Sequence, residues 1–244
     1  MKRISAGSQK VIIIIGPPGS GKGTQANLLA DRFGFYHLES SKVIEASFNV
    51  VAKESTISVN GKKYPLSEEK RKWRQGLLCT PAVVAFLIKN KIKLLAERGE
   101  SLIFSGSLRT LYEAQELFPV LKELYGLSNI KVISLVINLK ESVFRNSHRK
   151  ICELMRHPVL YSKETEKLAH CPLDGSKLKT RKGLDDPDTI LVRLERFKKE
   201  TFPVLGYLRS QKVKIAVISG SPAPAKVFQD ILKALKLKGV NLEK

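Results

Sequence analysis

The hydrophobic residues of this chain fall into short β-branched runs separated by longer segments with apolar residues at helical spacing. The short runs predict four buried strands, at residues 11–15, 102–104, 132–137 and 214–218. The longer segments predict helices at residues 21–33, 81–96, 110–125, 140–151, 190–211 and 225–235. Strands that alternate with helices predict an α/β core around a parallel sheet.

The first strand and helix carry the clearest boundary signals. The run Val-Ile-Ile-Ile-Ile at 11–15 stops at Gly16, and the helix that follows stops before Gly34, a residue type that favours helix C-termini. The long helix at 190–211 is expected to bend around Pro203, because proline removes a backbone donor.

Two polar stretches, at residues 47–73 and 157–188, interrupt this alternation. The first contains Asn60-Gly61, a dipeptide typical of hairpin turns. Both stretches can be read as plain surface loops. Loops of this length in a compact domain are also commonly functional lids, so both interpretations stay open.

Charge narrows the function to classes of protein that handle anions. The 244 residues carry 43 Lys and Arg against 23 Asp and Glu, a formal net charge of +20. This charge suits a nucleic-acid binder, and it equally suits an enzyme with polyphosphate substrates. The lysines are spread over the whole chain with no basic arm or tail, so nucleic-acid binding ranks second.

Other features of the composition predict a cytoplasmic protein with no membrane segment. The strongest apolar run, at 11–15, is far shorter than a membrane span, and no signal-peptide pattern follows the basic N-terminus. Three cysteines form an odd and sparse set, which fits a reducing compartment better than a disulfide framework.

A glycine-rich loop lies between the first predicted strand and helix, and reads Gly16-Pro-Pro-Gly-Ser-Gly-Lys-Gly-Thr24. Glycines let a backbone fold around a phosphate with its N–H groups pointing inward. Lys22 adds a point charge for the outer phosphates, and the following helix contributes its positive N-terminus. The strand–loop–helix context is the one that a phosphate-binding loop requires.

This loop resembles that of the adenylate kinase family, in which glycine follows the lysine and threonine comes one residue later. The resemblance extends from about residue 11 to about residue 235. Further matching segments are Gly76-Leu77-Leu78-Cys79-Thr80, Ser105-Gly106-Ser107-Leu108-Arg109-Thr110, Arg145-Asn146-Ser147-His148-Arg149-Lys150, Asp185 with Arg193, and Ile218-Ser219-Gly220-Ser221-Pro222.

The resemblance implies a P-loop NTPase-type fold, with a parallel five-stranded sheet and helices on both faces. It implies one nucleoside monophosphate kinase domain over 1–244, with its core at 8–38, 81–150 and 189–238, an acceptor-binding insertion at 39–80 and a lid at 151–188. The implied reaction moves a phosphoryl group from Mg-ATP to a nucleoside monophosphate, with AMP as the expected acceptor. The implied oligomeric state is a monomer. The alternatives are an ATP-binding homologue without kinase activity and a nucleic-acid-associated P-loop ATPase.

The same resemblance assigns roles to individual residues. Phosphoryl transfer needs two nucleotides held in line and several cations around the migrating group. The implied catalytic residues are Lys22, Arg109, Arg149 and Arg193. The implied ATP-binding residues are Gly19, Ser20, Gly21, Lys22, Gly23, Thr24, Arg145 and Ser221. The implied acceptor-binding residues are Ser40, Lys42, Leu78, Arg109, Glu113, Lys182 (or its neighbour Arg181) and Arg193.

Several positions on the acceptor side depart from the family pattern. Ser105 replaces an aspartate that helps to order the waters of magnesium, and Lys42 and Glu45 carry charges exchanged relative to the family. Lys42 either supplies the cation for the acceptor phosphate, oriented by Glu45, or forms a surface ion pair of little consequence. Glu113 replaces a glutamine that reads adenine. Its carboxylate only accepts hydrogen bonds, so it favours an amino-bearing base over uracil.

The predicted lid holds two of the three cysteines. Some family members bind zinc there through paired cysteines, and here Cys171 and Asp174 keep one pair while Cys152 lacks its partner. His157 could complete a set of four with Cys152, Cys171 and Asp174. The favoured alternative is a lid held by packing and hydrogen bonds without metal.

Overall fold

The computed structural model describes residues 9–50, 56–74, 79–156, 158–181 and 185–237. Two compact units make up the chain. The first comprises the described parts of Met1–Ile15, Ala26–Ile133 and Glu200–Ala216, and the second those of Gly16–Gln25, Ser134–Lys199 and Val217–Lys244.

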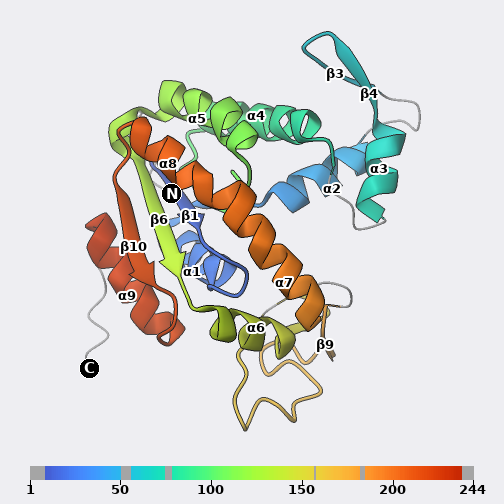
Figure 1. Cartoon of the computed structure of the whole chain (residues 1–244), viewed down its shortest axis with the longest axis vertical. Coiled ribbons are helices and arrows are strands. Elements are labelled where there is room, and N and C mark those ends of the chain that lie inside the picture. The colour runs from blue at the N-terminus through green and yellow to red at the C-terminus, as the bar shows by residue number, and fades with distance from the viewer. Residues whose placement is uncertain (1–8, 51–55, 75–78, 157, 182–184, 238–244) are drawn as a thin grey trace. The chain divides into compact units, whose positions relative to one another are not determined.

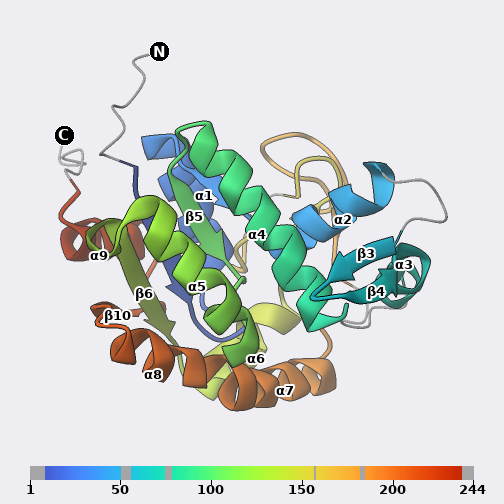
Figure 2. The same cartoon turned by 90° about the horizontal axis from the view of Figure 1, so that it is seen from above.

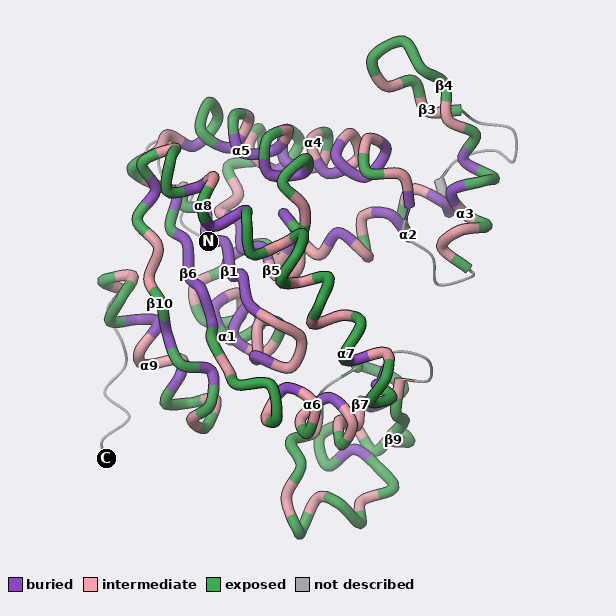
Figure 3. The backbone as a smooth tube through the Cα atoms, viewed as in Figure 1, coloured by how far each residue is buried: buried purple, intermediate pink, exposed green. Residues whose placement is uncertain are grey.

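A parallel sheet of five strands, in the order β10-β6-β1-β5-β2, forms the centre of the fold. The strands are β1 (Val11–Ile15), β2 (Tyr36–Leu38), β5 (Leu102–Ser105), β6 (Ile130–Val136) and β10 (Ile215–Ser219). All five side chains of β1 are buried, as the purple colour in Figure 3 shows. Burial of each such side chain stabilises the fold by about 1.5–3 kcal/mol. The predicted sheet with surrounding helices is therefore confirmed.

Two helices of the first unit follow the sequence signals closely. They are α4 (Pro81–Glu97) and α5 (Leu111–Tyr125), which lie side by side in Figure 2, and the same unit contains α8 (Phe202–Ser210; Figure 1). A 3₁₀ turn, Leu127–Asn129, follows α5. The helix α1 (Lys22–Phe33) ends as predicted at Gly34, whose φ of 71° suits glycine.

The polar stretch at 47–73 contains regular structure. The strands β3 (Thr56–Val59) and β4 (Lys62–Pro65) form the predicted hairpin, with positive φ at both Asn60 and Gly61. The helices α2 (Ser40–Val50) and α3 (Leu66–Arg74) flank it. Reading this stretch only as polar and lysine-rich missed both helices.

A buried carboxylate fixes α3 to the start of α4. Glu69 accepts hydrogen bonds from the backbone N of Thr80 at 2.7 Å, from the Thr80 hydroxyl at 2.6 Å and from Lys72 Nζ at 2.7 Å. Burial alone would raise the pKa of Glu69, but the hydrogen bonds from Lys72 and Thr80 outweigh it and lower the pKa. Glu69 is therefore a charged anchor for the segment that precedes α4.

The second unit contains α6 (Leu139–Ser147), α7 (Pro187–Arg196), α9 (Pro224–Leu235) and a small sheet in the order β8-β7-β9. Its strands are β7 (Lys150–Cys152), β8 (Pro158–Val159) and β9 (Leu178–Lys179). The helix predicted at 140–151 was thus too long. It ends at Ser147, whose hydroxyl bonds the carbonyl of Val143, and the next residues pair with β8 and β9 instead.

Two further sequence predictions need correction. The three-residue strand β2 was missed, because only Leu38 of its side chains is buried and the run is too short for a periodic signal. The single bent helix at 190–211 is two helices joined by a π-helical turn, Phe197–Thr201, and Pro203 lies in the first turn of α8. Among the described residues, no helix is long and apolar enough to cross a membrane.

Candidate active site

The glycine-rich loop joins β1 to α1, as the sequence predicted. Gly19 and Gly21 adopt φ of 78° and 87°, a backbone conformation that glycine enters without strain. Lys22 Nζ donates to the carbonyls of Gly16 at 2.7 Å and Pro17 at 2.8 Å, so its ammonium group lies within the loop. The loop thus combines a cation and a helix N-terminus, which together attract anions.

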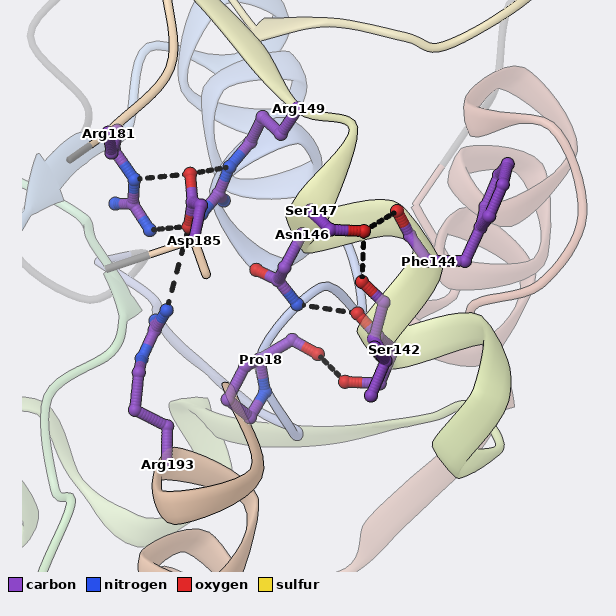
Figure 4. Close-up of polar contacts among 10 residues, drawn as sticks. Pro18, Ser142, Phe144, Asn146, Ser147, Arg149, Arg181, Asp185 and Arg193 are labelled. Carbon is purple, nitrogen blue, oxygen red and sulfur yellow. Dashed lines mark hydrogen bonds and ion pairs between the residues drawn. The ribbon is translucent and has the colours of Figure 1, made fainter. Parts of the chain in front are cut away.

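A buried serine of α6 holds this loop from outside, and a buried asparagine of α6 bonds that serine's carbonyl (Figure 4). The Ser142 hydroxyl donates to the carbonyl of Pro18 at 2.7 Å, and Asn146 Nδ2 donates to the carbonyl of Ser142 at 2.8 Å. Both side chains are buried. Sequence reasoning missed them, although polar residues four apart on the inner face of an amphipathic helix are a readable signal.

The loop and α6 pack without spare room. A Cβ on Gly19 would lie 2.6 Å from Asn146 Nδ2, and a Cβ on Gly16 would lie 2.6 Å from the carbonyl oxygen of Leu135. Among the described residues, Ser20 Oγ and Asn146 Oδ1 are buried atoms without a hydrogen-bond partner. The close fit around Gly16 and Gly19 shows that these two positions accept only glycine with the present neighbours.

Gly19→Ala is expected to weaken ATP binding strongly. The substitution forces an alanine into positive φ, at about 1–2 kcal/mol, and drives its Cβ into Asn146. ATP affinity is measured by calorimetry for this variant and for Gly19→Ala/Asn146→Ala, which removes the clash and leaves the strained φ. We expect the double variant to recover affinity only in part. Gly206→Ala, in open space on α8, is the control, and full ATP affinity in Gly19→Ala would contradict the prediction.

The predicted ATP-binding residues Arg145 and Ser221 meet in the second unit. Arg145 donates to the carbonyls of Gly220 at 2.8 Å and Ser221 at 2.7 Å, and pairs with Glu141 at 2.7 Å. The Ser221 hydroxyl donates to Glu141 at 2.5 Å. The helix α6 therefore also fixes the loop that follows β10.

Three arginines converge on one buried carboxylate, Asp185 (Figure 4). Asp185 Oδ1 lies 2.5 Å from Arg149 Nη2, 3.0 Å from Arg181 Nη2 and 3.7 Å from Arg193 Nη1. Burial alone would raise the pKa of Asp185, but hydrogen bonds from Arg181 and Arg149 outweigh it and lower the pKa. One negative charge thus holds three guanidinium groups, which leaves a net positive cluster suited to phosphate.

The cluster contains one of the two cations, Arg181 and Lys182, between which the sequence did not decide. Arg181, named as the alternative to Lys182, belongs to the cluster, whereas Lys182 itself lies outside the described residues. The predicted residues Arg149 and Arg193 lie in the cluster with it, and Asp185 provides the group that organises them.

Two predicted acceptor-side residues, Arg109 and Glu113, meet at the start of α5 in the first unit. Arg109 Nε donates to the carbonyl of Gly106, and the backbone N of Arg109 donates to Glu113 Oε2 at 2.8 Å. The backbone N of Glu113 donates to the Thr110 hydroxyl at 3.1 Å. Thr110 and Glu113 therefore act as a helix cap, a pattern of Thr and Glu three apart that sequence reasoning overlooked.

The carboxylate of Glu113 thus accepts a hydrogen bond from a backbone N–H group. This gives Glu113 a structural role in addition to the predicted contact with a nucleotide base. It is 8% exposed, and burial raises its pKa.

Ser105, at the end of β5, takes part in a hydrogen-bonded row of three side chains. His37 Nε2 lies 2.6 Å from Ser105 Oγ, and His37 Nδ1 lies 2.8 Å from Asn27 Oδ1. Burial lowers the pKa of His37, which favours the neutral imidazole. Sequence reasoning singled out Ser105 and missed its partner.

Ser105→Asp is expected to raise the pKa of His37, because a carboxylate beside Nε2 favours the charged imidazole. The ring protons of His37 are followed by NMR during a pH titration of the wild type and the variant. Ser105→Asn is the matched control, since it has nearly the same size and no charge. An unchanged His37 titration in Ser105→Asp would mean that the two side chains do not interact in solution.

The remaining acceptor-side predictions have mixed outcomes. The hydroxyl groups of Ser40 and Ser107 lie 2.7 Å apart in the interior. Lys42 Nζ lies 2.5 Å from Glu39 Oε1 on the surface, so among the described residues its ion-pair partner is Glu39, and the expected orientation by Glu45 is wrong. Leu78 lies outside the described residues.

Two cysteines and an aspartate gather in the small sheet, as the sequence suggested. Cys152 Sγ, Cys171 Sγ and a carboxylate oxygen of Asp174 lie within 4.8 Å of one another. His157, the expected fourth ligand, lies outside the described residues. The described residues therefore offer three donors, one fewer than a structural zinc site requires.

Comparison with known proteins covers most of the chain. The family model described as adenylate kinase matches residues 14–213. An adenylate kinase of Chlamydia trachomatis serovar L2 is 31% identical, over 96% of this chain and 93% of that protein. An adenylate kinase of Caldicellulosiruptor saccharolyticus is 27% identical, across 92% of this chain and 98% of that protein. An adenylate kinase of Hydrogenobaculum sp. is 28% identical, across 92% of this chain and 100% of that protein.

Proposed function

Because the chain belongs to the adenylate kinase family, whose members are ATP-dependent nucleoside monophosphate kinases, we propose that it transfers the terminal phosphoryl group of Mg-ATP to AMP. The observation that carries the proposal is the arginine cluster around Asp185, in the same unit as the glycine-rich loop. Several planar cations near a phosphate-binding loop are what transfer of a phosphoryl group requires.

The ATP side of the proposal rests on the second unit. Backbone N–H groups of residues 19–24 bind the phosphates, and Lys22 exchanges its two carbonyl partners for phosphate oxygens. The guanidinium of Arg145 and the loop at Ser221 bind the adenosine end. Magnesium arrives on the phosphates of ATP as part of the substrate. Hydroxyl groups such as that of Thr24 are suitable oxygen ligands for it.

The lid and its cations complete the ATP side. Arg149, Arg193 and Arg181 or Lys182 neutralise the migrating group, and the segment 151–188 acts as the lid that excludes water. The proposal includes no zinc, since the described cysteines and Asp174 do not complete a tetrahedron.

The acceptor side of the proposal rests on the first unit. Arg109 grips the phosphate of the monophosphate, and the segment 39–80, with Ser40, Lys42 and Leu78, forms the acceptor-binding insertion. A monophosphate with an amino-bearing base, such as AMP, is preferred over UMP because Glu113, in addition to capping α5, accepts from the amino group.

Lys42→Ala is expected to raise the KM for the monophosphate while the KM for ATP stays constant. Its ion pair with Glu39 is exposed and contributes little to stability, so the ammonium group is available to an anionic ligand. Initial rates are measured with each substrate varied in turn. Lys63→Ala removes an exposed hairpin lysine and serves as the control. An unchanged monophosphate KM would remove Lys42 from the site.

One experiment tests the proposed function as a whole. The protein is mixed with Mg-ATP and with AMP, CMP, GMP or UMP in turn, and the diphosphate products are separated by chromatography. We expect ADP from both partners with AMP, and inhibition by a bisubstrate analogue that links two adenosines through phosphates. Faster turnover of UMP would contradict the base preference. ATP hydrolysis stimulated by RNA or DNA would instead support a nucleic-acid-associated P-loop ATPase. ATP binding without phosphoryl transfer would support a homologue without kinase activity.

A further inference from the structure

Two reduced thiols face each other in the small sheet of the second unit. Cys152 is the last residue of β7, and Cys171 begins the turn that leads to β9. Their sulfur atoms lie within 4.8 Å of each other, and the residues are only 1% and 4% exposed. A disulfide requires a sulfur–sulfur distance of about 2.05 Å, so the two sulfur atoms must approach each other before the bond can form.

The backbone around the thiols holds the two cysteines opposite each other. Cys152 pairs with Leu178 in the antiparallel sheet, and His170 forms a bridge with Lys177. The turn between His170 and Lys177 is closed by two hydrogen bonds. Cys171 N donates to the Ser176 carbonyl at 2.7 Å, and Gly175 N donates to the Cys171 carbonyl at 2.9 Å. The proximity of the thiols is therefore built into the pairing of the strands.

The third member of the cluster is already occupied. Asp174 accepts a hydrogen bond from Cys152 Sγ at 3.0 Å and another from the Ser176 hydroxyl at 2.7 Å. These bonds lower the pKa of Asp174, the one from Cys152 most of all. With three donors among the described residues and the carboxylate engaged in this way, the cluster does not fit a structural zinc site.

We propose that Cys152 and Cys171 are a modification site, at which a peroxide converts the thiol pair into a reversible disulfide. Peroxide first oxidises one thiol to a sulfenic acid and leaves as water. The second thiol then attacks that sulfur, the S–S bond forms, and a second molecule of water departs. The two thiols lose two electrons and two protons in total, and a dithiol reductant restores them by exchange.

The third cysteine provides an internal comparison. Cys79 is buried in the first unit, and burial, with the nearby charge of Glu69, raises its pKa to about 11. A thiol that stays protonated reacts slowly with oxidants. Cys79 is also the one cysteine of its unit, whereas the other two lie together in the second unit, so oxidation should cross-link the pair and spare Cys79.

The test uses the whole purified chain. Its zinc content is measured first, and the protein is then exposed to hydrogen peroxide, digested without reduction and analysed by mass spectrometry. We expect one cross-linked peptide joining Cys152 to Cys171, a loss of about 2 Da from the intact chain, and recovery with dithiothreitol. Of the three thiols, only Cys79 should remain titratable.

Variants make the assignment specific. Cys79→Ser should still form the cross-link, whereas Cys152→Ser and Cys171→Ser should not. Proteolysis within residues 153–170 should slow after oxidation, because the disulfide closes this loop. Stoichiometric zinc that protects both thiols would overturn the proposal, and so would oxidation that links Cys79 or joins separate chains. Should the single variants fail to fold, the peptide map of the wild type still decides.

Discussion

Lys22→Ala is expected to lower kcat about 10²–10³-fold, the usual effect of removing one preorganised cation from a charge-stabilising site. The carbonyls of Gly16 and Pro17 hold the ammonium group of Lys22 inside the glycine-rich loop, so the substitution removes a positioned cation. Phosphoryl transfer from ATP is measured with saturating substrates, and thermal unfolding checks that the variant is folded.

The control for this substitution is Lys226→Ala, which removes a lysine of the same unit that pairs with Asp230 on the surface of α9. Its turnover should match that of the wild type, because exposed ion pairs contribute little. Turnover near the wild-type rate in a folded Lys22→Ala protein would exclude the proposed role of the loop.

Asp185→Ala is expected to lower both stability and turnover. The carboxylate holds Arg149, Arg181 and Arg193, and its side chain is 2% exposed. Removing one partner of a buried ion pair costs about 3 kcal/mol or more, because the guanidinium groups lose their counter-charge. Urea unfolding measures the loss of stability, and kcat should fall as the arginines separate.

The pH dependence of this contribution follows from the direction of the pKa shift. The folded-state pKa of Asp185 is lowered, so its contribution is fully present above the unfolded-state pKa of about 3.9. It is lost as the pH falls further, through the folded-state pKa. Asp230→Ala, which breaks an exposed pair, is the matched control. If both variants unfolded at the same urea concentration, Asp185 would not be the organising group.

Much of the fold could be predicted from the chain, because its strong signals are local. The buried run at β1, the glycine that ends α1 and the Asn60-Gly61 turn each specify a conformation within a few residues. The strands β2 and β7 are short and owe their conformation to partners distant in sequence. Pairing of this kind overrides local helical periodicity, which is why residues 150–151 were assigned to a helix.

The candidate site divides in the same way. Lys22 and the glycines could be placed from sequence, since the strand, loop and helix that position them are contiguous. Asp185, Ser142 and His37 could not be assigned their contacts, because each acts through a group brought near by folding. Glu113 has a second role that its family position did not indicate. Its family position suggested contact with a base, while a local capping pattern with Thr110 explains its observed hydrogen bonds.

Side chains of α6 and of the residues directly after it contact three different parts of the second unit. Ser142 reaches Pro18, Arg145 reaches Ser221, and Arg149 reaches Asp185. Substitutions in these three places share one rigid support, so their energetic effects should not add. A double-mutant cycle across α6 would then report coupling between residues that never touch, and selection would act on them as a group.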